Sequence, residues 1–287
     1  MSLILRLNEL ISHMPAKNKI KKTCFPIKLI ALFFIGAFSS LSMAPTNISA
    51  ALFIGLSSLY ICITKASSPL KGALCGMFFS IGYFCFSLSW IGNALLVENN
   101  PYWWAWPFAV LGIPLILSLF SFTGCLIYKF LFHQESNVLN FISFVTILSL
   151  TDYARGNLFT GFPWNLYGYT WIDILPIAQT VALSDIYFLN TLTIFWASLP
   201  AYILCKKNNI YSRTIIGVVA FVSFITCFLF GTMHMKNIEA EKLETKIMVT
   251  VIQPNIEQSE KWKPENRVKN FMTLLDLSKP NTENAVN

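Results

Sequence analysis

The chain has 287 residues, of which 55% are hydrophobic and only 12% charged, and its formal net charge is +7. A soluble globular domain carries about 25% charged residues, so this composition excludes an ordinary soluble enzyme and predicts a protein that crosses a membrane several times. The excess of Lys and Arg is explained by membrane topology, and we expect no nucleic-acid partner.

Cysteine and histidine spacing predicts neither a disulfide framework nor a metal site. The 7 Cys lie in or beside apolar runs and form no CxxC pair, and the 3 His are scattered without an HExxH motif. Buried apolar positions are the usual place for such cysteines. We therefore expect no metal and no cofactor.

The N-terminal segment 1–25 is basic and precedes the apolar run 26–43. This arrangement resembles a cleaved signal peptide, and Ser42-Met43-Ala44 offers small residues for cleavage. Further apolar runs follow at once and Pro45 stands just after that point, so we expect the segment to be retained. Residues 1–25 are interpreted as a cytoplasmic N-terminal segment.

Seven apolar runs predict a transmembrane helical domain over residues 26–233. About 20 apolar residues suffice to cross a bilayer, and each run is long enough for this. Two of the runs exceed one span without reaching two, so a turn or a proline kink at Pro107, Pro114 or Pro176 is expected within them. The runs are 26–43, 48–64, 70–96, 102–132, 138–154, 174–204 and 213–233.

The distribution of basic residues predicts that the N-terminus is cytoplasmic. With that orientation, the outer loops 44–47 and 97–101 carry no Lys or Arg, and the loop 155–173 carries only Arg155. Cytoplasmic loops of membrane proteins are enriched in Lys and Arg, so the chain after about residue 234 is expected outside. The cytoplasmic loops would hold Lys65, Lys71, Lys129, Lys206, Lys207 and Arg213.

The last part of the chain changes character and predicts the start of an α/β domain. Residues 234–246 are charged and read as a linker, and the β-branched run 247–252 reads as a buried strand that ends at Gln253-Pro254-Asn255. Residues 264–278 begin with Pro264 and have helical spacing. One strand and one helix cannot form a core, so the domain 247–287 is expected to be incomplete.

The stretch 160–169 lies between two long apolar runs and contains two Gly, one Pro and four aromatic residues. Pro163 removes a backbone donor and the glycines loosen the chain, so a straight spanning helix is not expected. Aromatic side chains of this density are typical of the membrane–water interface. Two interpretations remain open: an interfacial loop that anchors its neighbours, or a collar that faces substrate.

Two carboxylates within apolar runs call for an explanation, because an ionised group at mid-bilayer costs at least roughly 2.5–3.5 kcal/mol. Asp152 stands three residues before Arg155, and we expect an ion pair at the outer end of that helix. Asp185 could bind a partner helix, line a wet cavity or simply be tolerated. Trp262 is expected to rest on lipid or on its own domain.

Two motifs carry a resemblance to a known family. Thr-Asp-Tyr-Ala-Arg-Gly at 151–156, followed by Phe-Thr-Gly-Phe-Pro-Trp-Asn at 159–165, resembles the membrane domain of bacterial apolipoprotein N-acyltransferase. Val-Ile-Gln-Pro-Asn-Ile at 251–256, with Lys261-Trp262, resembles the start of that family's nitrilase-like (CN hydrolase) domain. The resemblance covers residues 25–280.

The resemblance implies a multi-pass enzyme of the bacterial inner membrane with an extracytoplasmic nitrilase-like domain. Such enzymes transfer a fatty acyl chain from phospholipid to the N-terminal diacylglyceryl cysteine of an apolipoprotein, through a Cys thioester with a Glu base and an assisting Lys. It implies structural or interfacial roles for Asp152, Arg155, Gln253 and Asn255. The residues implied in binding substrate are Gly161, Phe162, Pro163, Trp164, Asn165 and Trp262.

The sequence also departs from the family pattern. Asp152 stands where Glu is usual, and the catalytic Glu, Lys and Cys would follow Trp262 in segments that residues 263–287 do not match. We therefore expect a truncated N-terminal portion that lacks catalytic residues, is inactive alone, and could be completed by a second polypeptide. The alternatives are a non-catalytic scaffold that binds lipid or lipoprotein, and, less favoured, a transporter that uses Asp152 and Asp185 as a relay.

Overall fold

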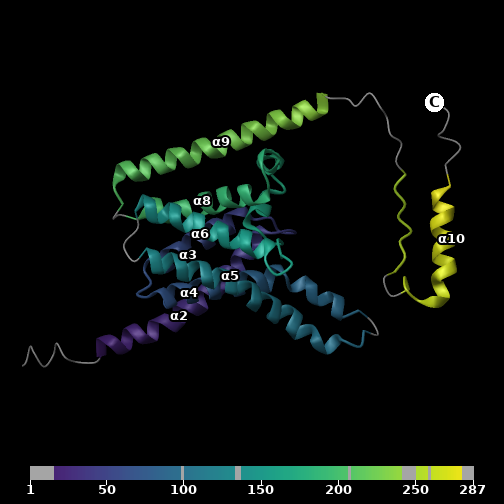
Figure 1. Cartoon of the computed structure of the whole chain (residues 1–287), viewed down its shortest axis with the longest axis horizontal. Helices are drawn as coiled ribbons and strands as arrows, with labels where there is room; N and C mark the ends of the chain where they lie inside the picture. The colour runs from purple at the N-terminus through teal and green to yellow at the C-terminus, as the bar shows by residue number, and fades with distance from the viewer. Residues whose placement is uncertain are drawn as a thin grey trace, which may run out of the picture.

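The computed structural model describes residues 16–97, 100–132, 137–205, 208–240, 250–257 and 260–279, and all regular structure in these ranges is helical (Figure 1). Side chains are described from Phe25 onward in α2, and up to Asn237 in α9. The long helices are α2 Ala16–Ser39, α3 Ser49–Thr64, α4 Pro69–Ser87, α5 Ile113–Leu131, α6 Val138–Asn157, α8 Ile186–Leu204 and α9 Ile210–Ala240.

Five helical segments of the described chain are long and apolar enough to cross a membrane. α3 is a shorter apolar helix of 16 residues, and α6 is not among the five, so the count of seven spans stays a prediction. Apolar side chains on the outside of the bundle, such as Phe34 and Phe221, are 62% and 68% exposed, as lipid contact requires. The five are Phe25–Ser42, Pro69–Ser87, Trp103–Leu131, Ile186–Leu204 and Ile210–Asn237.

The two longest apolar runs are interrupted, as predicted. The first contains a short 3-10 turn at Trp103–Ala105 and a π-helical segment at Phe108–Gly112 before α5 begins. The second contains α7 Leu175–Ala178 and a 3-10 turn, Gln179–Leu183 (η6), before α8. Proline is tolerated best in the first turn of a helix, and Pro114 and Pro176 occupy that position in α5 and α7.

The long helices form a closed ring in the order α2, α4, α5, α6, α8 and α3. Helix α9 packs outside the ring against α8, α7 and η6, and it lies at the edge of the bundle in Figure 1. Aromatic side chains fill the interior. Tyr60 contacts the rings of Phe141 and Phe144, and Phe141 stacks on Tyr202 with their centroids 4.7 Å apart. These four side chains are at most 2% exposed. The ring therefore has a solid core.

The helices α2 and α4 approach so closely that only glycine fits between them. A Cβ atom at Gly36 would overlap the carbonyl of Phe79, and one at Gly82 would overlap the carbonyl of Phe33. Close backbone approach at small residues is a common way for helices to associate in a membrane, where water drives no burial of apolar surface.

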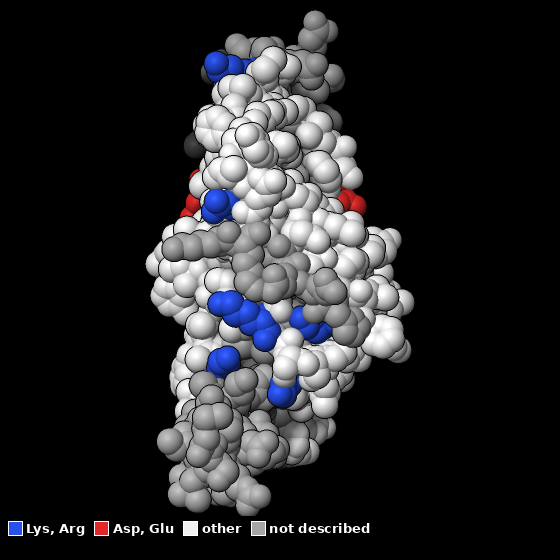
Figure 2. Space-filling model, turned by 90° about the vertical axis from the view of Figure 1, so that its left-hand side faces the viewer, with Lys and Arg blue, Asp and Glu red and all other residues white. Residues whose placement is uncertain are grey.

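The bundle has two chemically different ends. We call one the collar end, where residues 158–185 link α6 to α8, and the other the cation end, where α3, α5 and α8 end and α4, α6 and α9 begin. Figure 2 looks toward the cation end and shows Lys and Arg grouped across its middle, with Asp and Glu only at the rim. Lys129 donates to the carbonyl of Thr64 and Arg213 to that of Ile203, at 2.9 and 3.0 Å. Cations at the carboxyl ends of helices are favoured by the helix dipole.

The helix predicted in the tail is present, whereas the described part of the predicted strand does not form a strand. A turn at Pro264–Asn266 leads into α10, Arg267–Ser278, which lies within the expected helix and has no buried residue. Residues 247–249 lie outside the described ranges, while residues 250–252 are described and form no strand; Val251 is 87% exposed. A strand needs a neighbour for its hydrogen bonds, and the described chain supplies none. The incomplete α/β domain therefore stays a prediction.

Candidate functional site

The collar, residues 158–171, is a loop that folds back onto the end of α6 and finishes in a 3-10 turn, Tyr167–Trp171. Gly161 has a φ of +77°, and a Cβ atom there would overlap the carbonyl of Gly156, so glycine is required. Phe159 and Asn165 also have positive φ values, of 53° and 55°. The amide of Phe162 donates to the carbonyl of Arg155 at 2.8 Å, which joins the collar to the helix. The predicted break in helical structure is confirmed.

Arg155 holds the collar in place through its guanidinium group. Its Nη1 donates to the carbonyls of Phe162 and Trp164, at 2.7 and 2.8 Å, and its Nη2 lies 3.3 Å from Oδ1 of Asp152. The guanidinium also lies 5.1 Å from the ring centroid of Phe84. Arg155 is 2% exposed, so this is a buried crosslink between the helix and the loop.

Asp152 forms the predicted pair with Arg155, and the pair is buried inside the protein. Asp152 is 8% exposed, and its second oxygen accepts from Nδ2 of Asn190 in α8 at 3.0 Å. Oδ1 of Asn190 in turn accepts from the amide of Gly168 at 3.2 Å. A buried ion pair needs such additional partners, because burial removes water from both charges.

Asn190 and Tyr83 belong to this network and were not found from the sequence. The hydroxyl of Tyr83 in α4 donates to the carbonyl of Asn165 at 3.2 Å. Neither residue lies in a motif, and no local pattern shows that α4 and α8 reach the collar. The only available signal was an amide, Asn190, within an apolar run, since polar side chains in such runs usually have a partner.

A pocket of about 300 Å³ lies between the collar and α5. Its lining is mainly aliphatic and aromatic, from residues of α5 between Ile113 and Phe120 and from Leu158 to Phe162 on the collar, and Arg155 is the one charged residue among the described residues that line it. An apolar pocket of this kind accommodates hydrocarbon better than a polar group. Gly161 and Phe162, which were expected to bind substrate, line it.

A second pocket, of about 240 Å³, lies on another side of the collar and is lined by Asn165, Trp90 and Tyr169 among others. Trp164 stacks on Trp90 with their centroids 5.2 Å apart, and it is 48% exposed. The exposed Trp103 also lies at this end of the bundle, in the turn that precedes α5. Aromatic rings at this position suit a membrane–water interface.

The interpretation of Asp185 as a deep charge in an apolar run was wrong. Asp185 is exposed and precedes the first residue of α8, and its Oδ1 accepts from the amide of Phe188 at 2.8 Å. This is an N-cap, in which a side chain satisfies one of the free amides at the start of a helix. The sequence Ser-Asp before Ile186 was a signal for such a cap.

We expect Asp185→Ala to lower the free energy of unfolding by about 1 kcal/mol and Asp185→Asn to leave it nearly unchanged, because Asn caps helices as well as Asp. Chemical unfolding of the two purified variants in detergent measures both values. Equal losses for the two variants would show that the charge, and not the cap, is what matters.

The residues of the tail that were expected to act with the collar are exposed. Trp262 is 75% exposed with Nζ of Lys261 5.5 Å from its ring centroid, and Gln253 and Asn255 are exposed too. Asn255 has a φ of 48°. Within the described part of the chain, these side chains share no hydrogen bond with the collar, so their roles stay predictions.

No group of three or more His, Cys, Asp and Glu that could hold a metal ion occurs among the described residues. The described cysteines are free thiols in or beside the helices, and three of them are buried. The described collar therefore offers no set of metal ligands. Its chemistry is an apolar pocket beside a loop that a buried charge holds in shape.

Comparison with known proteins identifies the family. Residues 35–199, more than half of the 287, match the family model described as the apolipoprotein N-acyltransferase N-terminal domain. The chain belongs to the apolipoprotein N-acyltransferase family. The match includes the collar, Arg155, Asp152 and Asn190, so the network described above lies within the family's membrane domain. Family membership does not favour the scaffold or the transporter alternative.

Curated relatives named apolipoprotein N-acyltransferase agree with this family assignment. The chain is 29% identical to that of Rhodopseudomonas palustris, over 89% of this chain and 48% of the relative. It is 31% identical to the apolipoprotein N-acyltransferase of Brucella melitensis, over 88% of this chain and 48% of the relative. It is 30% identical to the one of Rickettsia typhi, over 87% of this chain and 49% of the relative. The chain therefore spans about half the length of the curated relatives it matches.

Proposed function

We propose that this chain is the membrane-embedded N-terminal portion of an enzyme that transfers a fatty acyl chain from phospholipid to the N-terminal diacylglyceryl cysteine of an apolipoprotein. The observation that carries the proposal is the collar, held by Arg155 beside an apolar pocket of about 300 Å³ within the region that matches the family. Its role is to bind and orient the lipid substrates.

We assign a role to each part of the enzyme from the chemistry of the described residues. The pocket between α5 and the collar would hold an alkyl chain, because its lining is almost wholly apolar. Phe162, Pro163, Trp164 and Asn165 would present the lipid headgroup region to the acyl-transfer centre, and Trp262 would cover that centre from the tail. The thiol, the general base and the assisting Lys would come from the half of the enzyme that the chain does not match.

A protein that holds substrate without these groups would form no acyl-enzyme. We expect the purified chain, incubated with radiolabelled phospholipid, to give no hydroxylamine-sensitive label. Co-expression with the C-terminal half of a family member, in cells depleted of their own enzyme, is expected to restore labelling and growth. A stable thioester on the chain alone would contradict this assignment of roles.

For topology, we propose that residues 1–25 are cytoplasmic, that 26–233 cross the inner membrane seven times, and that the linker 234–246 and the nitrilase-like segment 247–287 lie outside. Two facts support this. The cation end contains Lys65, Lys71 and Lys129, and cytoplasmic loops are rich in Lys and Arg. Helix α9 continues to Ala240, so the first part of the proposed linker 234–246 is helical.

A reporter fused after residue 240 tests the orientation. We expect alkaline phosphatase at this position to be active, because it folds outside the cytoplasm, and a fluorescent protein that folds only in the cytoplasm to be dark. The opposite pair of results would invert the topology. A fusion in the loop between α3 and α4 supplies the matched control, with the reverse expectation.

A further inference from the structure

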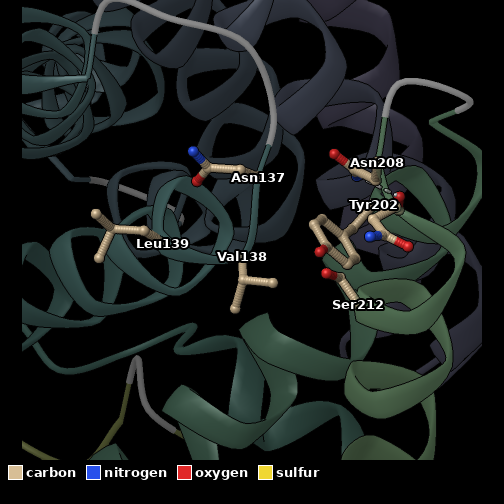
Figure 3. A pocket seen from close by; sticks show the side chains of 7 residues that line it. Asn137, Val138, Leu139, Tyr202, Asn208 and Ser212 are labelled. Carbon is tan, nitrogen blue, oxygen red and sulfur yellow. Dashed lines mark hydrogen bonds between the residues drawn. The ribbon is translucent and has the colours of Figure 1, made fainter.

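A pocket at the cation end has no role in the function proposed above. It has a volume of about 290 Å³ and lies where α6 and α9 begin and α8 ends (Figure 3). Asn137, Asn209, Ser212 and Tyr202 contribute polar side chains to its lining. No Asp or Glu is among the described residues that line it. Its lining therefore contains more polar side chains than that of the pocket at the collar.

Two long helices direct their N-termini toward this pocket. α6 has 20 residues and begins at Val138, and α9 has 31 residues and begins at Ile210. Oδ1 of Asn137 accepts from the amide of Asn140 at 2.8 Å, and Oδ1 of Asn209 from the amide of Tyr211 at 3.0 Å. The N-terminus of a helix carries a partial positive charge and backbone donors, and so it attracts an anion.

Tyr202 supplies a buried donor without a partner. Its side chain is 0% exposed, and its hydroxyl makes no hydrogen bond within the part of the chain that the structure describes. The ring is fixed by stacking on Phe141, and Figure 3 shows the hydroxyl directed toward the pocket, on the side of Ser212. A buried hydroxyl normally has a partner, so this one is available to a ligand that accepts a hydrogen bond.

The surrounding charge also favours an anion. Arg213 follows Ser212, and its Nη1 donates to the carbonyl of Ile203 at 3.0 Å, which holds the guanidinium at this end of the bundle. The pocket thus combines two positive helix ends and a buried hydroxyl without a partner, and Arg213 lies next to the lining residue Ser212 in the sequence. In the topology proposed above, this end of the bundle lies at the level of the lipid headgroups. We propose that it binds the phosphate group of a phospholipid headgroup. This proposal does not rest on acyl transfer.

Binding is measured on the full purified chain in a neutral detergent, from the rise in melting temperature with ligand concentration. The probes are dihexanoyl phosphatidylglycerol, which carries a phosphate in a lipid, and inorganic phosphate, which carries it alone. We expect a saturable rise with the lipid, weakened by added salt. An equal affinity for inorganic phosphate would identify a free anion as the ligand in place of a lipid and would overturn the lipid part of the proposal.

Two variants distinguish a ligand site from a structural feature. Asn137→Asp keeps the cap on α6, since Asp caps as well as Asn, but places a negative charge in the pocket. We expect the lipid to bind it about tenfold more weakly. Tyr202→Phe keeps the stacked ring and removes the donor, and we expect a loss of about threefold or more in lipid affinity with no loss of stability in the absence of lipid.

Ser68→Asp is the matched control, because Ser68 caps α4 at the same end of the bundle, with its hydroxyl accepting from the amide of Lys71 at 3.3 Å, outside the pocket. It adds the same charge as Asn137→Asp, and we expect it to leave the lipid affinity unchanged. If the two charge variants weaken binding equally, or if neither probe raises the melting temperature of the unmodified chain, the proposal is wrong.

Discussion

Arg155→Ala is expected to lower the free energy of unfolding by about 3–5 kcal/mol and to release the collar from α6. The substitution leaves the buried carboxylate of Asp152 without its cation, and it removes the donors to the carbonyls of Phe162 and Trp164. Unfolding in detergent measures the first effect. Limited proteolysis within residues 158–166 measures the second, because a loop without these bonds becomes accessible to a protease.

The exposed pair Lys279–Asp276 is the control, because it has the same spacing of three residues and both side chains are at least 70% exposed. Exposed ion pairs contribute little, so Lys279→Ala should cost far less stability than Arg155→Ala. The double variant Asp152→Leu with Arg155→Met should regain part of the stability lost in Arg155→Ala, since it buries no unpaired charge. A loss in Arg155→Ala no larger than that in Lys279→Ala would refute the crosslink.

Gly82→Leu is expected to separate α2 from α4 and to cost about 3 kcal/mol. The obstacle is the backbone carbonyl of Phe33, which cannot turn aside as a side chain could. A spin label on each helix, with the distance between them measured by pulsed electron resonance, would report the separation directly. The unfolding free energy would report its cost.

Gly217→Ala in α9 provides the comparison. A Cβ atom at Gly217 would meet only Cδ1 of Ile203, at an ordinary 3.6 Å. Alanine in a helix is favoured over glycine by roughly 0.5–1 kcal/mol, so this variant should be slightly more stable than the parent chain. If both glycine variants were neutral, the close approach of α2 and α4 would not determine the packing of the ring.

The membrane character, the apolar runs and the irregular collar were predictable because each depends on local chemistry. Pro107, Pro114 and Pro176 lack a backbone donor, and together with the length of the two longest runs this implied that the runs would be interrupted. Gly161 and Pro163 lie close together in the collar, and they likewise implied that no straight spanning helix would form there. The helix within 264–278 was predicted from spacing, and it forms without a buried face.

The environment of each charge was decided only by the tertiary structure. Asp185 reads as a buried charge in the sequence, yet the chain turns just before it and leaves it at a helix end. The segment 247–252 was expected to be a strand, and its described part forms none. A strand depends on hydrogen bonds to a partner elsewhere in the chain, and the local sequence does not specify that partner.

Composition and periodicity alone determined that this is a helical membrane protein with a loop of glycine, proline and aromatic residues between two apolar runs. Only the packed bundle shows that Asp152, Arg155 and Asn190 meet, because α6 and α8 are brought together by their apolar faces and not by these side chains. The physical reason is that hydrogen bonds between residues distant in the sequence depend on packing, which no local pattern specifies.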